Sequence, residues 1–259
     1  MYDIDQVSRN SEKDLAFVLI HGGGLDTWVW ERMIPLLNFP ALAVRRAALG
    51  TNLNRLTLTD SAKYIQSQIE SAGFKQVILV AHSIGGILAP PVAELLPQRV
   101  AHIVFIGANI PPEGSSAISI FRPSERFGIA VWLRLMAWRL SFMNKAVEQD
   151  MRKTLCNDLD EATVQQVLAG GKNPEPPALF YEPVSRLRMP SVPCTYIKLL
   201  QDQGLLPPSK QDEMAANIGA KVVTLNTGHT AMLSRPDELA KLLNGVASEV
   251  NVQQNSDRR

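Results

Sequence analysis

The chain has 259 residues, of which 46% are hydrophobic, and its 26 Lys and Arg nearly balance its 25 Asp and Glu, for a formal net charge of +1. This length and hydrophobic content predict a globular enzyme with one large α/β core. The near-neutral charge argues against nucleic acid and anionic membranes as partners, because both require a basic surface. The polar N-terminus contains no apolar leader or span, so we expect a cytoplasmic protein.

Cysteine content adds a further restriction. Cys156 and Cys194 lack the spacing of metal ligands, and we expect both to be reduced thiols without a disulfide. We predict no metal and no other cofactor. The expected partner is a small-molecule substrate, and the expected assembly is a monomer or a homodimer.

Short apolar runs alternate with segments of helical periodicity along most of the chain. The predicted strands are residues 15–20, 41–45, 76–81, 100–107, 194–200 and 221–225. The predicted helices are residues 58–72, 84–96, 208–218 and 236–250, and the polar tail after 250 is expected to fray. This alternation predicts an α/β fold with a mostly parallel central sheet flanked by helices.

The alternation breaks over residues 111–193. Prolines bound this stretch on both sides, and it contains helical signals but no convincing strand. We therefore predict a core domain of residues 1–110 and 194–259 with an inserted helical cap of residues 111–193. Within the cap, Trp132 and Met136 belong to a strongly apolar run, which either packs within the cap or lines an apolar substrate pocket.

A serine stands at the tip of a turn between a buried strand and a helix. Residues 77–80 are apolar on both faces and are followed by His82-Ser83-Ile84-Gly85-Gly86. In such a nucleophile elbow the residues two before and two after the serine must be small, as Ala81 and Gly85 are. We predict that Ser83 is a nucleophile of acyl transfer.

A serine nucleophile requires a base, and the chain offers four histidines. His229 lies in the loop between the last predicted strand and the last helix, where functional loops of a parallel sheet collect. It is the predicted base. We expect His21, His82 and His102 to be structural.

The carboxylate that orients the base should come from a loop between the nucleophile and His229. Asp202 fits, because it follows the strand 194–200. The alternative is a turn aspartate that satisfies its own loop. Asp212 and Glu213 are weaker candidates inside a predicted helix, and Glu113 is a fallback at the entrance to the cap.

Backbone amides for an oxyanion are offered by the run His21-Gly22-Gly23-Gly24, which follows the first strand. We predict the Gly23 amide as one donor and the Ile84 amide, at the start of a helix, as the other. The run lacks the Lys and Ser or Thr of a phosphate-binding loop, which argues against a nucleotide site.

Together these motifs resemble the α/β-hydrolase fold over roughly residues 15–250, and within it the methylesterase and hydroxynitrile lyase branch. The segments that carry the resemblance are 17–23, the pair Trp28 and Trp30, and 81–86, 202–204 and 228–236. The resemblance implies Ser83, Asp202 and His229 as a catalytic triad, with the amides of Gly23 and Ile84 as oxyanion hole.

Two departures from that branch bear on the substrate. The loop after the second strand is rebuilt, and its Arg45 and Arg46 are expected on a solvated face, the alternative being that they meet an acidic substrate group. The lyase relatives lead one to expect Thr after the first His and Lys after the catalytic His, whereas this chain has Gly22 and Thr230. That difference favours hydrolysis.

We therefore predict a serine hydrolase that cleaves a small, largely apolar carboxylic ester, of the methyl ester or lactone class, through an acyl-enzyme. Gly22 and Met232 are further candidates for its substrate pocket. Two alternatives stay open. One is a lyase or other non-hydrolytic reaction with the same triad, and the other is a ligand-binding receptor with little turnover.

Overall fold

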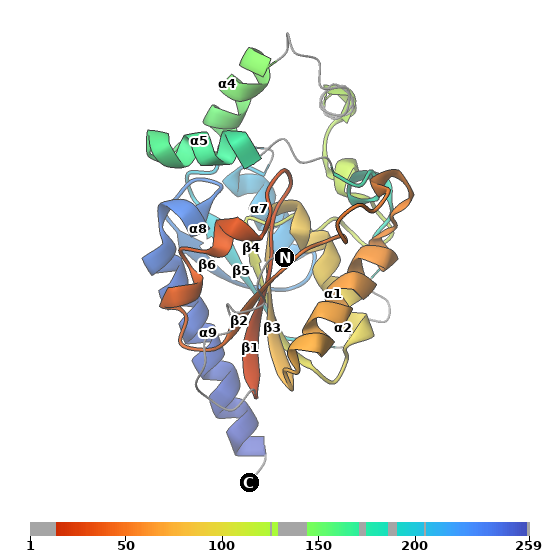
Figure 1. Cartoon of the computed structure of the whole chain (residues 1–259), viewed down its shortest axis with the longest axis vertical. Coiled ribbons are helices and arrows are strands. Elements are labelled where there is room, and N and C mark those ends of the chain that lie inside the picture. The colour runs from red at the N-terminus through yellow and green to blue at the C-terminus, as the bar shows by residue number, and fades with distance from the viewer. Residues whose placement is uncertain are drawn as a thin grey trace.

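The computed structural model describes residues 14–124, 126–128, 144–170, 175–185, 191–204 and 206–257. Within these residues six strands form one parallel sheet in the order β2-β1-β3-β4-β5-β6 (Figure 1). They are β1 (Leu15–Ile20), β2 (Ala41–Val44), β3 (Gln76–His82), β4 (Val100–Ile106), β5 (Cys194–Leu199) and β6 (Lys221–Leu225). The predicted α/β fold is confirmed, and every predicted strand is present.

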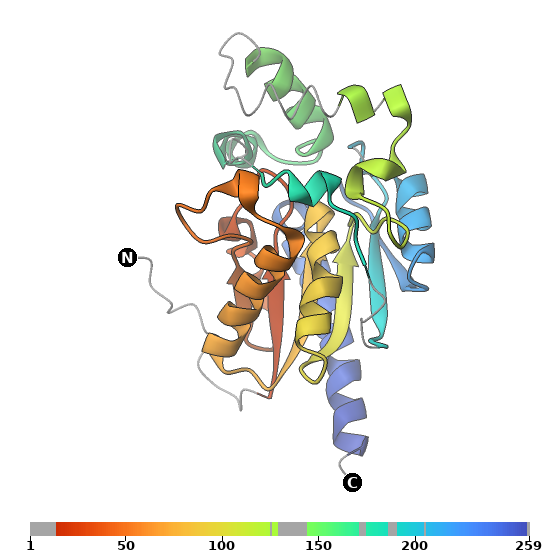
Figure 2. The same cartoon turned by 90° about the vertical axis from the view of Figure 1, so that its right-hand side faces the viewer.

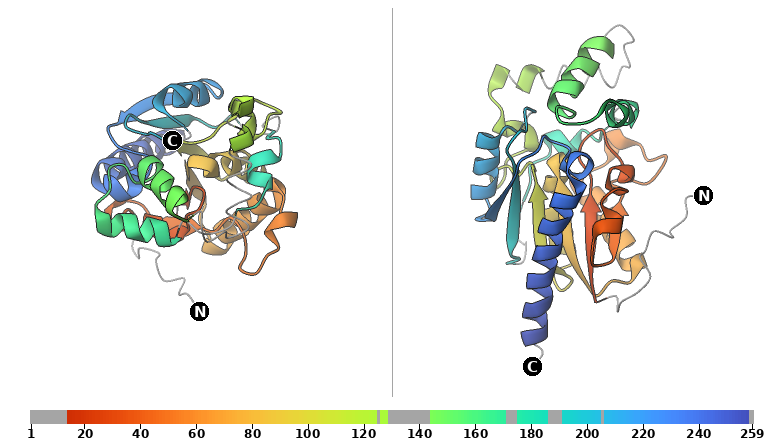
Figure 3. Two further views of the ribbon diagram at one scale, coloured as in Figure 1. Left: turned by 90° about the horizontal axis from the view of Figure 1, so that it is seen from above. Right: turned by 90° about the vertical axis from the view of Figure 1, so that its left-hand side faces the viewer.

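Helices cover both faces of the sheet, and the central strands β1 and β3 are almost entirely buried for that reason, whereas the edge strand β6 is largely exposed. One core cluster joins the sheet to α1 (Leu58–Ala72), α2 (Ala89–Leu95) and α7 (Pro208–Ala216), and the other joins it to α9 (Pro236–Asp257). Figure 2 shows α1 and α2 side by side on one face, and Figure 3 shows α9 on the opposite face. Successive residues of β1 belong alternately to the two clusters.

Helix ends follow local chemistry. Thr57 caps α1 in a capping box with Asp60, and Gly73, with φ of 74°, ends the helix. The prediction of a frayed tail from residue 251 is wrong for the described part, because α9 continues to Asp257. No glycine or proline interrupts residues 251–257, so nothing in the sequence stops the helix there.

The segment between β4 and β5 contributes α4 (Asn144–Thr154), α5 (Glu161–Gly170) and the short α6 (Ala178–Tyr181). In Figure 1, α4 and α5 lie beyond one end of the sheet, away from the C-terminus of α9. The described part of residues 111–193 contains helices and one isolated β-bridge, between Ser116 and Pro183, but no β-strand. The division into core and cap stays a prediction, and Trp132 and Met136 lie outside the described residues.

Both cysteines are free thiols, and burial raises the pKa of each to about 11. Among the described residues there is no helix with the length and apolar character of a membrane span. The same residues contain no group of three or more His, Cys, Asp or Glu side chains arranged to hold a metal ion.

Candidate active site

Ser83 lies at a strained turn directly after β3. Its φ is 53°, and among the described residues it is the one non-glycine with positive φ. The chain continues as a 3-10 helix, Ser83–Leu88, before α2 begins. The single helix predicted over residues 84–96 is therefore divided, because Pro90 and Pro91 have no N–H to bond the carbonyls four residues earlier.

Two glycines allow the loop after β1 to pack against this turn. A Cβ on Gly85 would lie 2.6 Å from the His21 carbonyl oxygen. A Cβ on Gly22 would lie 2.7 Å from Nδ1 of His82 and 2.9 Å from Cβ of Ser83. Side chains at these two positions would push the loops apart, so glycine is required for the close approach.

The structure brings Ser83, His229 and Asp202 together from the ends of three strands. Nε2 of His229 lies 2.9 Å from Oγ of Ser83, and its Nδ1 lies 2.7 Å from Oδ2 of Asp202. An ionised carboxylate can only accept, so Nδ1 carries the proton and Nε2 is left to accept from the serine hydroxyl. This is the tautomer that a general base needs. The catalytic roles of the three residues stay predictions.

Asp202 is held in place by its own loop and by a glutamine that carries no motif in the sequence. Its Oδ1 accepts from the Gly204 amide at 2.8 Å, and its Oδ2 accepts from Nε2 of Gln211 at 3.2 Å. The side chain of Gln211 is fully buried and also bonds the backbone of Leu199. Asp202 therefore bonds both its own turn and His229, two roles that the sequence left as alternatives.

Charge and burial act in opposite directions on the histidines. Burial lowers the pKa of His229, but the charge of Asp202 and the hydrogen bond to it raise this pKa more, to above 6.5. Burial, together with the neighbouring His229, lowers the pKa of His82 well below 6.5. Neutral His82 donates from Nε2 to the His229 carbonyl at 2.9 Å, so it supports the backbone of the base.

The two predicted oxyanion donors lie next to each other. Ile84 belongs to the first turn of the 3-10 helix, where N–H groups have no partner within the helix. A Cβ on Gly23 would lie 3.4 Å from Cγ2 of Ile84. The loop after β1 therefore contacts the elbow at these two residues, and their role as oxyanion donors stays a prediction.

A turn after α4 ties together the loops that carry the acid and the base. Oδ2 of Asp158 accepts from the Gly228 amide at 2.7 Å and from the Thr227 hydroxyl at 2.6 Å. Asn157 donates to the Gln201 carbonyl at 2.9 Å. Asn157 therefore holds the backbone directly before Asp202, and Asp158 holds the backbone directly before His229.

This packing predicts that Gly228→Ala destabilises the protein by about 1–3 kcal/mol, as overpacking does, and lowers turnover. The added Cβ would collide with Oδ1 of both Asn157 and Asp158. The matched control is Gly245→Ala in α9, where a Cβ meets nothing within 4 Å, and which should stabilise by about 0.5–1 kcal/mol. Urea unfolding of both variants measures the difference. A Gly228→Ala protein as stable as the wild type would contradict the steric constraint at Gly228.

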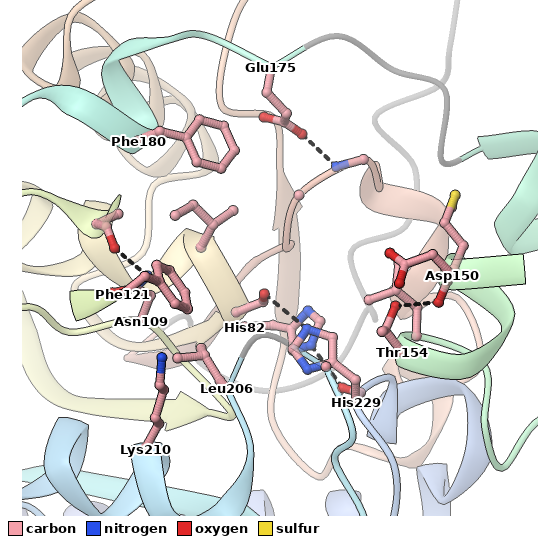
Figure 4. A pocket seen from close by; sticks show the side chains of 18 of the residues that line it. His82, Asn109, Phe121, Asp150, Thr154, Glu175, Phe180, Leu206, Lys210 and His229 are labelled. Atoms are coloured by element: carbon pink, nitrogen blue, oxygen red, sulfur yellow. Dashed lines mark hydrogen bonds between the residues drawn. The ribbon is translucent and has the colours of Figure 1, made fainter. Parts of the chain in front are cut away.

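A cavity of about 640 Å³ opens over Ser83 and His229. Figure 4 shows Glu175 and Phe180 entering it from one side, Asp150 and Thr154 from another, and Phe121 and Lys210 from a third. Its wall is mostly apolar and includes Leu25, Ile118, Phe121, Met151, Phe180 and Leu206.

Two of the predicted pocket residues do not line this cavity. Met232 lies on the short helix α8 (Ala231–Ser234) and is completely buried in the core cluster that contains Trp30. Gly22 lies behind the cavity wall, against His82 and Ser83, whereas Gly23 and Gly24 line it. The predictions of Met232 and Gly22 as pocket residues are wrong, because α8 directs Met232 into the core and Gly22 packs against His82 and Ser83.

The expected solvated face at Arg45 and Arg46 is wrong for Arg46. β2 ends at Val44, so strand alternation does not apply to the two arginines. Arg46 is only 6% exposed, and its Nη2 pairs with Oε1 of Glu175 at 2.7 Å. Arg45 is partly exposed and lies 3.6 Å from Asp26.

The parallel sheet, the elbow after β3 and the histidine after β6 are features of α/β-hydrolases. The family model of the alpha/beta hydrolase family matches residues 17–242. The chain belongs to this family.

Relatives and solved structures agree with this assignment. Salicylic acid-binding protein 2 of Nicotiana tabacum is 28% identical, with 91% of this chain and 98% of that protein covered. Polyneuridine aldehyde esterase of Rauvolfia serpentina is 27% identical, with 91% and 97% covered. The provisionally named chloroplastic methylesterase 15 of Arabidopsis thaliana is 26% identical, and the match spans only 55% of its length. The predicted resemblance to the methylesterase branch is confirmed.

Among solved structures, an extracellular α/β-hydrolase from a Paenibacillus species has a TM-score of 0.74 at 21% identity, with 88% of this chain and 97% of that chain covered. Polyneuridine aldehyde esterase has a TM-score of 0.67 at 23% identity, with 90% and 99% covered. At these identities the likeness shows the fold.

Proposed function

We propose that the protein is a serine hydrolase that cleaves a small, largely apolar carboxylic ester, of the methyl ester or lactone class. The observation that carries the proposal is the chain of contacts from Ser83 Oγ to His229 and on to Asp202, at 2.9 Å and 2.7 Å. Ser83, at one end of this series of contacts, lines a cavity that is large enough for a small ester.

In the proposed reaction His229 takes the proton of Ser83 while Oγ attacks the ester carbonyl carbon. The tetrahedral oxyanion accepts hydrogen bonds from the amides of Gly23 and Ile84. Its collapse breaks the bond to the alcohol, which leaves with the proton held by His229. His229 then takes a proton from water, whose oxygen attacks the carbonyl carbon of the acyl-enzyme. Collapse of the second tetrahedral intermediate breaks the bond to Ser83 Oγ, which takes the proton back from His229, and the acid is released. Asp202 stabilises the imidazolium formed in each half.

The walls of the cavity support the apolar part of this substrate class. Most of the surface that lines the cavity is apolar, so an uncharged acyl or alcohol group is desolvated there at little cost. A substrate with a charged group would need a buried partner for that charge.

The names of the relatives support the same reaction class. Several are methylesterases of Arabidopsis thaliana, and another is an esterase of Rauvolfia serpentina. The Paenibacillus hydrolase is described as sharing structural and functional homology with tobacco salicylic acid-binding protein 2. We extend ester hydrolysis, and a small-molecule substrate, from these proteins to this chain.

A lyase reaction with the same triad is disfavoured by the two positions that differ from the lyase relatives. Thr230 is buried and its hydroxyl donates to the Leu155 carbonyl at 2.7 Å, so no cation stands next to His229 in sequence. At position 22 a side chain would collide with His82 and Ser83, which leaves no space for a hydroxyl.

The purified protein is expected to hydrolyse p-nitrophenyl acetate and to release no cyanide from mandelonitrile. Two backbone donors suit a tetrahedral oxyanion, each worth about 3 kcal/mol or more, while the residue that follows the base is Thr230 and not the lysine expected in the lyase relatives. Release of p-nitrophenolate and of cyanide is measured side by side. Cyanide release without ester turnover would favour the lyase, and neither activity, together with tight binding of a small ligand, would favour the receptor.

A further inference from the structure

Glu175 brings a buried carboxylate to the wall of the catalytic cavity. Its Oε1 accepts from the Gly24 amide at 2.6 Å and from Nη2 of Arg46 at 2.7 Å. The side chains of Glu175 and Arg46 are only 10% and 6% exposed. Glu175 therefore joins the segment before α6 to the loop after β1 and to the loop after β2.

The second oxygen of this carboxylate accepts no hydrogen bond from the described part of the protein. Oε2 of Glu175 is buried and has no hydrogen-bond partner among the described residues. A carboxylate has only acceptor sites, and a buried acceptor without a donor is costly. Glu175 lines the cavity, and Figure 4 shows its carboxylate above it, on the side opposite His229. A substrate group can supply the donor.

The charge of Glu175 is already balanced, and this decides what kind of donor fits. Arg46 forms a close ion pair with the carboxylate. A cationic substrate group would leave a surplus positive charge in a buried site, whereas a neutral hydroxyl adds a donor without adding charge. An anionic carboxylate or phosphate group has no hydrogen to donate to Oε2. The site therefore favours a neutral hydroxyl.

The position of Glu175 relates this donor to the ester bond. Gly24 follows Gly23, the proposed oxyanion donor, and both line the cavity that contains Ser83. By holding the Gly24 amide, Glu175 lies beside the part of the loop that faces the reacting carbonyl. One small ester could therefore place its carbonyl at Ser83 and a hydroxyl of its own at Oε2 of Glu175.

We propose that Oε2 of Glu175 accepts a hydrogen bond from a hydroxyl of the substrate, so that the preferred substrates are neutral hydroxylated esters. This inference rests on the proposed ester hydrolysis and specifies its substrate class. Glu175 acts in it as a specificity residue that contacts substrate, and Arg46 as the residue that neutralises and positions it.

The test compares hydroxylated esters with their methoxy analogues, which have similar shape but no donor. The panel is methyl 2-hydroxybutanoate, methyl 3-hydroxybutanoate and 2-hydroxyethyl butanoate, each with its methoxy analogue, and kcat/KM is measured by titration of the acid released. In the wild type at least one hydroxyl compound should exceed its analogue by about tenfold or more, the value of a hydrogen bond to a charged group.

In Glu175→Gln this ratio should fall to near unity. The amide oxygen can keep the bond from Gly24, and its NH₂ group then donates equally to a hydroxyl and to a methoxy oxygen. The matched control is Glu148→Gln, on the exposed face of α4, where the carboxylate pairs with Arg152. That variant should keep the wild-type ratio.

The outcomes separate the two proposals. Turnover of none of the esters would contradict the proposed function itself. Turnover without preference for hydroxyl over methoxy in the wild type would overturn the role of Glu175 and leave ester hydrolysis standing, even if the variant fails to fold. An equal loss on all esters in Glu175→Gln, with the ratio kept, would show a structural role only and would also overturn it.

Discussion

Substitution of Ser83 by alanine is expected to lower kcat for ester hydrolysis by about a millionfold, as loss of a serine nucleophile does in a triad enzyme. Without Oγ there is no acyl-enzyme, and His229 is left without the group that it deprotonates. The oxyanion donors and the cavity stay in place, so a small residual rate over the uncatalysed reaction is expected. Hydrolysis of p-nitrophenyl acetate at saturating substrate measures the loss.

The control for Ser83→Ala is Ser71→Ala, on the exposed side of α1, which should keep full activity. Circular dichroism and unfolding midpoints should show that both variants are folded. A folded Ser83→Ala protein with turnover close to that of the wild type would contradict the assignment of the nucleophile.

Asp202→Asn is expected to lower kcat by about ten thousandfold. The amide removes the charge that stabilises the imidazolium, and it no longer requires the proton of His229 to be on Nδ1. The fold should be kept, because the asparagine oxygen can still accept from the Gly204 amide. Rates are measured on p-nitrophenyl acetate near the pH of maximal activity.

The same variant should change the pH dependence in a defined direction. His229 must be neutral to act as base, so activity is lost as the pH falls through its pKa. Burial lowers this pKa and Asp202 raises it more, so in the wild type the loss should be centred above pH 6.5. Without the carboxylate only burial acts, and the midpoint should move to lower pH.

Two other carboxylates serve as comparison for Asp202. Asp212→Asn removes a partly exposed carboxylate that pairs with Lys198, and it should leave both rate and pH profile unchanged. Glu113→Gln tests the fallback acid at the entrance to the predicted cap. Wild-type rate in Asp202→Asn together with inactivity in Glu113→Gln would move the role of the acid to Glu113.

The sheet was predictable because each strand is a short apolar run bounded by turn residues. Predicted strand ends agree with the structure to within one residue, and those of β1 and β6 agree fully. α1 was also predicted with both ends, because Thr57 and Gly73 mark them. The 3-10 helix at Ser83–Leu88 was not predicted, because the prolines that interrupt the hydrogen bonds lie after it, at positions 90 and 91.

The three residues of the proposed triad could be selected from the sequence because they follow strand ends in a fixed chain order. The parallel sheet then brings Ser83, Asp202 and His229 to one edge. Residues that support them carry no such signal. Gln211 and Asp158 come from segments with no motif, and only the folded chain places them beside Asp202 and Gly228.

The error at Arg46 has a similar cause. A charged residue after a strand is usually solvated, and the carboxylate that buries this one comes from Glu175, 129 positions later. Burial of Met232 depends on the direction of one short helix, which periodicity over four residues cannot give. Local sequence patterns predict neither an ion pair between distant residues, such as Arg46 and Glu175, nor the direction of so short a helix.

The most direct test of the account is covalent labelling by a fluorophosphonate, which reacts with an activated serine and forms an analogue of the tetrahedral intermediate. Peptide mapping by mass spectrometry is expected to place a single adduct on Ser83, with loss of labelling in Ser83→Ala and much slower labelling in Asp202→Asn. No adduct, or an adduct on another serine that persists in Ser83→Ala, would contradict the claim that Ser83 is the nucleophile of this enzyme.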